Sequence, residues 1–313
     1  MKSETTLPPG RTGLPLLGET LTFLKDSFNF IERGVAQHGP VFRTHLLGRH
    51  TAVITGPEAC ARWVDQDLVE RQGAMPPHVK ELFAGETLPS LDGAAHLTRK
   101  KLVLAGFGKS ALEQYVTSLG ALIDTEVDKW VKQGDVALVP DLKTLAIEGI
   151  CSNMMGLARG PELEALLADY ATIGPGLGSL PIALPGTAFT RARRALSHIL
   201  SVFGEQVAAH RQTPREDGLS RMLAAKAPDG TQLSDDDAAR EMHHIVVAGL
   251  IIWAELANAV VQLASAEAIR EGLRKEIEGK LKSAPPTLDA LMGMPLLGRV
   301  VMEIKRTCPI VPA

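Results

Sequence analysis

Two pairs of side chains in this 313-residue sequence are spaced so that they could act together on one ligand or on each other. His96 and Lys100 are four residues apart, and Glu303 and Arg306 are three apart. Residues at these spacings lie on one face of an α-helix. His96 and Lys100 could therefore both donate hydrogen bonds to a carboxylate, while Glu303 and Arg306 could form an ion pair.

The second pair has apolar neighbours, namely Val300, Val301 and Ile304. Because a buried charge without its partner is costly, these neighbours predict a buried, structural ion pair. The alternative is a solvent-exposed pair, which would contribute only about 0.2–0.5 kcal/mol.

The longest apolar run of the chain, residues 245–254, contains a third group of interest. Ala248 and Gly249 are followed by Ile251 and Ile252, and isoleucine can neither donate nor accept a proton. A transmembrane helix needs about 20 apolar residues. This shorter run therefore predicts a helix buried in protein, and we expect no membrane anchor.

The surrounding pattern predicts a mainly α-helical fold with a small N-terminal β-sheet, in a single domain over residues 1–313. The proline-rich stretch 7–19 should form an extended arm. Residues 41–55 should form a β-hairpin that turns at Gly48. Apolar residues then recur at helical spacing through a helical body over residues 57–313.

Composition and charge argue against two kinds of function. A net charge of −3 and 4% aromatic residues provide neither the basic surface nor the stacking side chains of a nucleic-acid-binding protein. The three cysteines include no CxxC pair, which argues against a zinc site and favours a cytoplasmic location. His243 and His244 are adjacent and so point about 100° apart on a helix. We therefore expect no metal ligand in this chain and interpret the two histidines as polar residues at a helix entry.

Five segments together resemble the cytochrome P-450 superfamily, in particular its soluble bacterial members. In chain order they are LPPGRTGLPLLGE, HGPVFRTHLLGRHTAVITGPEA, DGAAHLTRKKLVLAGF, VVAGL and EIKRTCPIVP. Each segment alone is weak, whereas all five in this order form a specific pattern. The last segment contains Glu303 and Arg306, which match the structural ion pair of the family. The resemblance implies a P-450-like fold.

The resemblance also implies that the protein binds haem b, with a cysteine thiolate from a late loop as the iron ligand. That loop does not occur in the sequence, so we expect the fold to be incomplete at its C-terminus. Cys308 follows the Glu-x-x-Arg motif too closely to be this ligand, and Cys60 and Cys151 are expected to pack as small hydrophobic residues. The resemblance assigns His96 and Lys100 to the haem propionates, although the family usually has arginine at the position of Lys100.

In the same way, the resemblance assigns the central apolar helix to oxygen binding. Ala248 and Gly249 match the small residues that let this helix bulge over the haem. The family then has an acid and an alcohol that relay protons, but here Ile251 and Ile252 take their places. The usual relay is therefore absent.

The family's activity is insertion of one oxygen atom of O₂ into a substrate, with electrons from a separate ferredoxin or flavodoxin-type protein. The apolar stretches 70–90 and 170–190 are expected to enclose a small lipophilic substrate such as a terpenoid, a retinoid or a fatty acid. Within the second stretch, the glycine- and proline-rich residues 174–186 are expected to form a loop. Two alternatives stay open: a truncated, inactive family member, or an atypical enzyme that performs rearrangement or peroxide chemistry without the relay.

Overall fold

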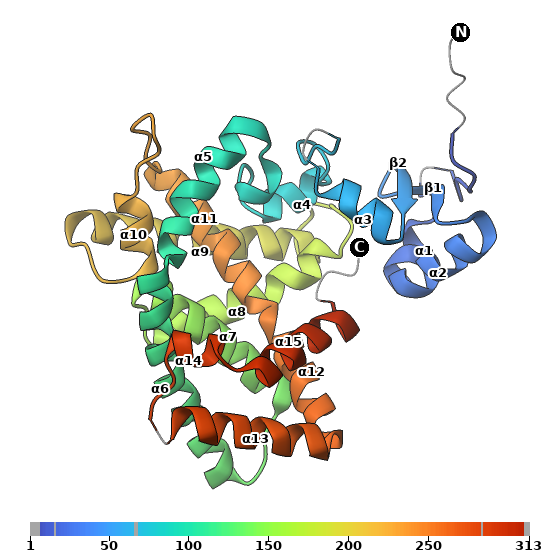
Figure 1. Cartoon of the computed structure of the whole chain (residues 1–313). Coiled ribbons are helices and arrows are strands. Elements are labelled where there is room, and N and C mark those ends of the chain that lie inside the picture. Colours follow the sequence, from blue (N-terminus) through green and yellow to red (C-terminus); the bar gives the residue numbers. More distant parts are fainter. Residues whose placement is uncertain (1–6, 16, 66–67, 283, 310–313) are drawn as a thin grey trace. The chain divides into compact units, whose positions relative to one another are not determined.

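The computed structural model describes residues 7–15, 17–65, 68–282 and 284–309. These residues form two compact units, each held together mainly by contacts within itself. The first unit extends to Pro77 and contains the two-stranded sheet. The second begins at His78 and, in its described residues, is built from helices (Figure 1). The predicted mainly α fold with a small N-terminal β-sheet is confirmed.

The first unit is organised around an antiparallel hairpin. Strands β1 (Val41–Leu46) and β2 (Arg49–Ile54) pair from Val41 with Ile54 to Leu46 with Arg49. The turn between them consists of Leu47 and Gly48, which both have positive φ, at 52° and 78°. Two positive φ values are characteristic of the tight turn that matches the twist of paired strands. The predicted hairpin with its turn at Gly48 is confirmed.

Helices and the arm pack around this hairpin. Helices α1 (Thr20–Lys25) and α2 (Ser27–His38) precede it, and α3 (Pro57–Trp63) follows it. The arm pairs with the outer side of β1, because Arg11 N donates to Arg43 O and Arg43 N donates to Pro9 O. The arm is thus extended, as predicted.

The second unit contains a long series of helices and two short 3₁₀ turns. They are α4 (Pro77–Leu82, across the boundary), η1 (Leu88–Ser90), α5 (Gly93–Leu104), η2 (Ala105–Phe107), α6 (Lys109–Gln133), α7 (Leu138–Met155), α8 (Pro161–Leu177), α9 (Ala188–Gln212), α10 (Gly218–Ala224), α11 (Asp235–Leu250), α12 (Ile252–Ser265), α13 (Glu267–Leu281), α14 (Leu288–Met292) and α15 (Pro295–Thr307).

The core of this unit lies where α7, α8, α9 and α11 meet (Figure 1). Its largest fully buried side chains include Leu166, Phe203 and Met242. Helices α8 and α9 approach closely because Gly176 has no side chain: a Cβ there would lie 2.2 Å from the Cβ of Ala192. This close approach requires glycine.

Two expectations about element bounds are corrected. The stretch 174–186 is only partly a loop, because α8 continues through Pro175 to Leu177. Proline lacks the N–H of a helical hydrogen bond, and α8 ends two residues after it. The central apolar helix is not continuous either, since Ile251 separates α11 from α12.

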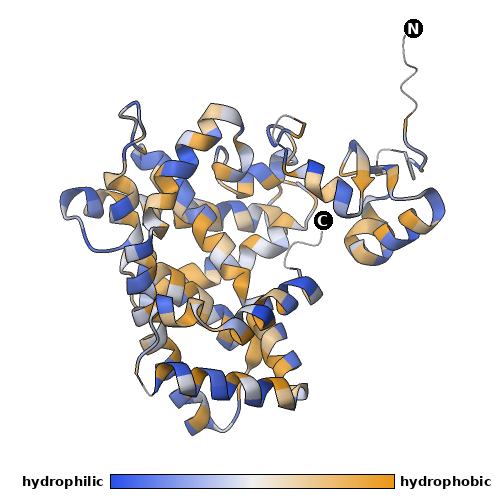
Figure 2. Ribbon diagram, viewed as in Figure 1, coloured by the Kyte–Doolittle hydropathy of each residue, from blue (hydrophilic) through white to orange (hydrophobic). Residues whose placement is uncertain are grey.

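The expected burial of the central helix holds only for its first half. Helix α11 buries eight residues, whereas α12 buries none. Ile252, Val260 and Val261 are 45%, 48% and 60% exposed, and Figure 2 shows the hydrophobic residues along α12. By length and composition alone, the stretch Asp235–Ser265 could cross a membrane, a test that core helices of soluble proteins also pass. The absence of an anchor therefore stays a prediction.

The contact of Gly176 with Ala192 generates a stability prediction. We expect Gly176→Ala to lower the free energy of unfolding by about 1–3 kcal/mol, because the added methyl group must push two packed helices apart. Gly174 is a matched control on the same helix, since a Cβ added there would meet no described atom within 4 Å. Gly174→Ala should leave stability equal or raise it by up to about 1 kcal/mol. Urea denaturation followed by circular dichroism measures both, and equal effects would contradict the close-contact interpretation.

Candidate functional site

The break in the central helix lies within the predicted oxygen-binding stretch. Ile251 N donates to Val247 O at 3.3 Å, and Ala254 N donates to Ile251 O at 3.1 Å, three residues back rather than four. Gly249 is buried just before the break, and a Cβ there would lie 3.1 Å from Ile150 of α7. Such interruptions in helices are frequent at functional sites. The family-derived roles of these residues stay predictions.

The four residues singled out in this stretch differ in exposure. Gly249 is buried, while Ala248, Ile251 and Ile252 are exposed in the described structure. Neither isoleucine carries a group that could relay a proton, and Glu255 on the next turn is half-buried.

The predicted propionate ligands both lie on α5 but in different environments. His96 is 6% exposed, whereas Lys100 is exposed at the surface. The residue between them that reaches the interior is Arg99, whose side chain is 15% exposed. The assignment of His96 and Lys100 to a cofactor stays a prediction, and Arg99 was not singled out from the sequence.

Arg99 joins α5 to α11 through a buried carboxylate. Its guanidinium lies 3.1 Å from Oε1 of Glu241, which is fully buried, and 2.8 Å from Oδ2 of Asp237. Oε1 of Glu241 also accepts a hydrogen bond from Leu88 N at 2.9 Å, and His244 Nδ1 lies 3.1 Å from Oε2. A buried charge is tolerated when it is paired and hydrogen-bonded. These contacts fix three segments of the chain to one carboxylate.

A sequence signal for this network exists. Glu241 lies four residues before Ile245 and three after Ala238, so it occupies the apolar stripe of α11. An acidic residue in such a stripe requires a buried partner, and only the fold identifies Arg99, 142 positions away, as that partner.

His243 and His244 are not polar residues at a helix entry, and that interpretation is wrong. His243 lies inside α11 with no exposed surface. Its Nε2 is 2.9 Å from Leu82 O, and its Nδ1 is 3.1 Å from the hydroxyl of Tyr170, on which its ring stacks. If Nε2 carries the proton, it donates to the carbonyl and Nδ1 accepts from the tyrosine. Burial lowers the pKa of His243 to about 4 and raises the pKa of Tyr170 well above its usual value.

The ion pair on α15 forms as predicted but is not buried. Arg306 donates to Glu303 twice, at 2.8 and 2.7 Å, and the two side chains are 70% and 56% exposed. The hydrogen bond from Arg306 lowers the pKa of Glu303. Of the apolar neighbours used to predict burial, Ile304 is buried and Val301 is 41% exposed. The predicted burial is wrong, because both charged side chains are exposed although Glu303 lines the same pocket as Val300 and Ile304.

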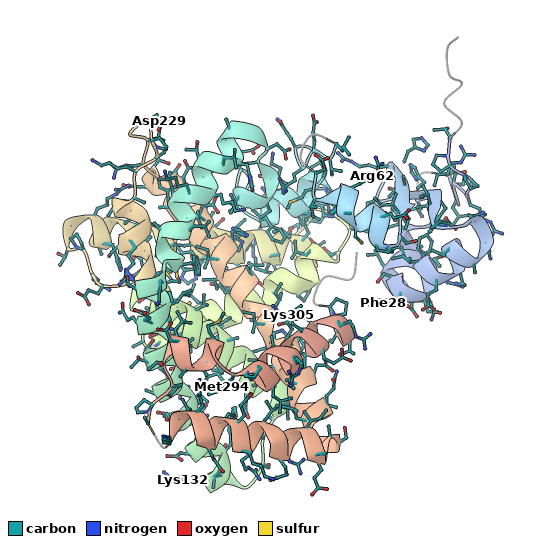
Figure 3. All side chains as sticks on the ribbon, viewed as in Figure 1. Phe28, Arg62, Lys132, Asp229, Met294 and Lys305 are labelled. Carbon is teal, nitrogen blue, oxygen red and sulfur yellow. The ribbon has the colours of Figure 1, made fainter. Side chains whose placement is uncertain are left out.

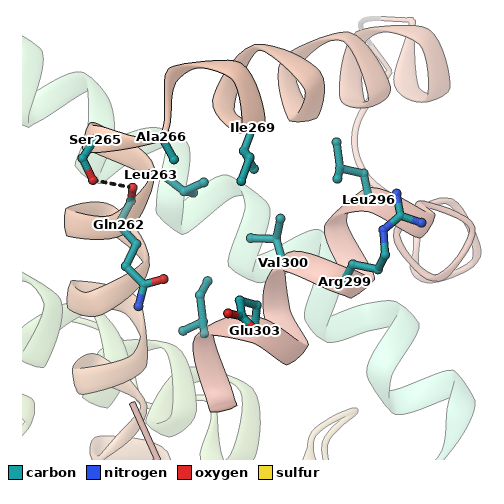
Figure 4. Close-up of a pocket in the computed structure, with 10 residues that line it drawn as sticks. Gln262, Leu263, Ser265, Ala266, Ile269, Leu296, Arg299, Val300 and Glu303 are labelled. Carbon is teal, nitrogen blue, oxygen red and sulfur yellow. Dashed lines mark hydrogen bonds between the residues drawn. The ribbon is translucent and has the colours of Figure 1, made fainter. Parts of the chain in front are cut away.

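Glu303 lines a surface pocket of about 440 Å³ between α12, α13 and α15 (Figure 4). Leu263, Ile269 and Val300 form its apolar walls. Gln262 spans its edge, where its Nε2 donates to Thr307 Oγ1 at 2.7 Å.

A second hollow of about 330 Å³ lies beside the helix break; we call it the α7–α8–α11 cavity. Its lining is mostly apolar and comes from α7, α8 and the two halves of the central helix. The lining residues are Lys143, Ile147, Leu167, Tyr170, Ala171, Ile173, Gly174, Pro175, Leu177, Val247, Leu250, Ile251 and Trp253. Residues of the stretch 170–177 line this cavity, whereas residues 70–90 do not, and the enclosure of a substrate by either stretch stays a prediction.

The three cysteines decide how well the described residues fit a haem. Burial raises the pKa of the Cys151 thiol to about 12, which keeps it protonated inside α7. Cys60 lies in the first unit on α3, and Cys308 caps the end of α15. A haem–thiolate site needs a thiolate that faces the iron. The described residues therefore do not form a complete haem site.

Comparisons with known proteins agree with one another. The family model "Cytochrome P450" matches residues 8–313. The chain is 29% identical over 308 residues to the putative cytochrome P450 120 of Synechocystis sp. and 25% identical over 320 residues to abscisic acid 8'-hydroxylase 2 of Arabidopsis thaliana. The solved structure of retinoic acid-bound cyanobacterial CYP120A1 superposes with a TM-score of 0.85 at 28% identity.

These matches cover nearly all of this chain but only part of each relative. They include 97% of the chain in both sequence comparisons and 96% in the structural one. The chain spans about two thirds of the length of the relatives, at 68%, 65% and 69% respectively.

The buried carboxylate generates a second prediction. Glu241→Gln keeps the shape of the side chain but removes the charge that Arg99 requires, and we expect it to lower the free energy of unfolding by about 2–4 kcal/mol. Asp236 is the matched control on the same helix, with an 89% exposed side chain 3.8 Å from Arg240. Asp236→Asn should change stability by less than about 0.5 kcal/mol. Urea denaturation compares the two, and a neutral Glu241→Gln would contradict the role of the network.

The buried histidine generates a pH prediction. Because the pKa of His243 is about 4 in the folded chain and 6.5 without burial, the unfolded chain binds the proton more readily between these values. Stability should therefore be lost as the pH falls from about 6.5 towards 4, with a slope of up to about 1.4 kcal/mol per pH unit from this group. His243→Gln should reduce that slope relative to the original chain, as measured by thermal unfolding across this range. An unchanged slope would show that other groups cause the loss.

Proposed function

Because this chain belongs to the cytochrome P450 family, we propose that it serves haem-dependent insertion of one oxygen atom of O₂ into a small lipophilic substrate. The observation that carries this proposal is the family match over residues 8–313, which includes the broken central helix. Electrons would come from a separate ferredoxin or flavodoxin-type protein in the cytoplasm.

The lipophilic character of the substrate is supported by two kinds of observation. The α7–α8–α11 cavity provides an apolar hollow next to the helix break. Relatives of the chain carry the names abscisic acid 8'-hydroxylase and retinoic acid-bound CYP120A1. A terpenoid, retinoid or fatty-acid-like molecule would suit such surroundings, since small-molecule sites are mostly apolar.

Within this proposal, the chain's own residues have limited roles. His96 and Lys100 on α5 would donate hydrogen bonds to the carboxylates of the haem. Ala248 and Gly249 would leave room beside the central helix. Neither Ile251 nor Ile252 can hold or transfer a proton, because the isoleucine side chain has no ionisable or hydrogen-bonding group. An iron ligand has to be supplied by a thiolate that the described residues do not offer.

The isoleucines favour a second candidate function. An enzyme that rearranges a peroxide, or takes oxygen in an already reduced form, does not need the acid–alcohol pair. Ile251 and Ile252 are compatible with that chemistry, and also with an inactive member of the family.

Haem reconstitution tests the proposal. The purified chain would be mixed with haem, reduced and exposed to carbon monoxide, and the Soret band recorded. A monooxygenase made of these residues requires haem uptake and the red-shifted band of a thiolate complex. Uptake without the red shift would contradict oxygen activation by these residues, and no uptake would favour the inactive alternative.

The same titration tests the two propionate ligands. We expect His96→Ala and Lys100→Ala each to weaken haem binding by about tenfold or more, since each removes a hydrogen bond to a charged group, worth about 1.5–3 kcal/mol. Lys101, also exposed on α5, is the matched control, and Lys101→Ala should leave the affinity unchanged. Equal losses in all three variants would indicate a general charge effect instead.

A further inference from the structure

The first unit contains a small cleft that has no part in the proposed function; we call it the arm–α2 cleft. Its volume is about 210 Å³, and its lining comes from the arm, α1, α2 and β1. All these segments belong to the first unit, whereas His96, Lys100 and the oxygen-binding stretch 248–252 belong to the second. The cleft can therefore be tested without haem and apart from the proposed function.

One side of α2 forms a wall of the arm–α2 cleft. Arg33 and Gln37 are four residues apart, as are Gly34 and His38, so these four residues lie on one side of the helix and line the cleft. Gly34 brings this side of α2 close to β1, because a Cβ there would lie 2.2 Å from the ring of Phe42. The polar side chains next to Gly34 thus border the space that remains between α2, β1 and the arm.

The cleft is rich in hydrogen-bond donors that have no acceptor. Arg11, Gln37 and His38 line it and make no side-chain hydrogen bond or ion pair within the part of the chain that the structure describes. Arg33 donates from Nε to Asn29 O at 3.2 Å. The two terminal nitrogens of its guanidinium have no acceptor among the described residues. These donors are available to a ligand.

Two carboxylates that could neutralise the arginines are already hydrogen-bonded. Glu19 lines the cleft and accepts from Thr44 Oγ1 at 2.7 Å. Asp26 accepts from the backbone and the side chain of Asn29 at 3.0 and 2.7 Å. The charges of Arg11 and Arg33 thus exceed the single charge that Glu19 brings to the cleft. A site with excess positive charge and unused donors favours an oxyanion.

We propose that the arm–α2 cleft binds a phosphate monoester group. Arg33 presents its two terminal nitrogens to two phosphate oxygens, which is the bidentate geometry of arginine–phosphate pairs. Arg11 and Gln37 donate from the arm and from the next turn of α2. A phosphate offers three acceptor oxygens, one more than a carboxylate, and two guanidiniums and an amide match this larger number.

The size and floor of the cleft limit the rest of the ligand. Phe30 and Phe42 line the cleft and are 6% and 2% exposed, so they form an apolar floor below the charged rim. A volume of about 210 Å³ lies below the range of about 300–1,000 Å³ for sites that enclose drug-sized ligands. The cleft therefore encloses the phosphate and only a small part of its organic substituent.

Calorimetric titration of the full chain with phenyl phosphate, without haem, tests the proposal. We expect saturable binding that weakens as KCl is added, and weaker binding of benzoate. A second arm measures co-sedimentation with phosphatidylcholine vesicles that contain phosphatidic acid. Binding in the first arm alone identifies a soluble ester, and binding in the vesicle arm identifies a lipid headgroup. No binding in either arm, or benzoate binding as tight as that of phenyl phosphate, overturns the proposal.

Variants separate this site from a general charge effect. Arg33→Gln should weaken phenyl phosphate binding about fivefold, since the site is open to solvent. Glu19→Gln keeps an acceptor for Thr44 but removes a negative charge, and should strengthen binding about twofold. Arg62, exposed on α3 of the same unit (Figure 3), is the matched control, and Arg62→Gln should leave the affinity unchanged.

Both arginines are exposed, so neither variant should affect folding, and circular dichroism verifies this. Equal losses in Arg33→Gln and Arg62→Gln, or unchanged affinity in Arg33→Gln, contradict the site. Weaker binding in a folded Glu19→Gln variant contradicts it as well.

Discussion

The buried carboxylate of Glu241 is the constraint on which the arrangement of the helical unit depends. It accepts from the backbone of Leu88, pairs with Arg99 of α5 and lies next to His244. A carboxylate in such surroundings is stable only when all these donors are in place. This one side chain therefore joins α5 to α11, in addition to the apolar packing of Leu102 and Val103. His96 and Lys100 are oriented by this contact, because they lie on the same short helix.

The central helix combines two halves with different requirements. In helix α11, the buried side chains of Glu241 and His243 are hydrogen-bonded to the backbone of Leu88 and Leu82, respectively. Helix α12 buries no residue and keeps apolar side chains at the surface. Ile251 lies between the two halves and interrupts the regular helical hydrogen bonding, so α12 does not continue α11 as one helix.

Features that depend on neighbouring residues could be predicted from the sequence. The hairpin turn at Leu47–Gly48 and the helix start at Ser234, whose hydroxyl accepts from Asp237 N, are encoded within a few positions. The ion pair of Glu303 and Arg306 was also predicted, because its spacing is local. Its burial was wrongly predicted, since exposure depends on which other helices cover α15.

Features that join distant segments could not be predicted in the same way. The partner of Glu241 is 142 positions away, and the partner of His243 in α8 is 73 positions away. The sequence shows only that a polar group interrupts an apolar stripe. The family resemblance supplied the central helix and the α5 residues, but it gave no role to Arg99, which lies in the same quoted segment and was identified only from its contacts.

The pairing of the N-terminal arm has a consequence for synthesis of the chain. Gly10 lies against Arg43 so closely that a Cβ would meet the Arg43 carbonyl oxygen at 1.9 Å. The arm is synthesised before its partner strand, which follows about 30 residues later, or roughly 2–6 s at ordinary rates of translation. The hairpin itself can close within about 10 µs once it is complete. The arm therefore cannot pair until β1 has been synthesised, although it precedes that strand in the sequence.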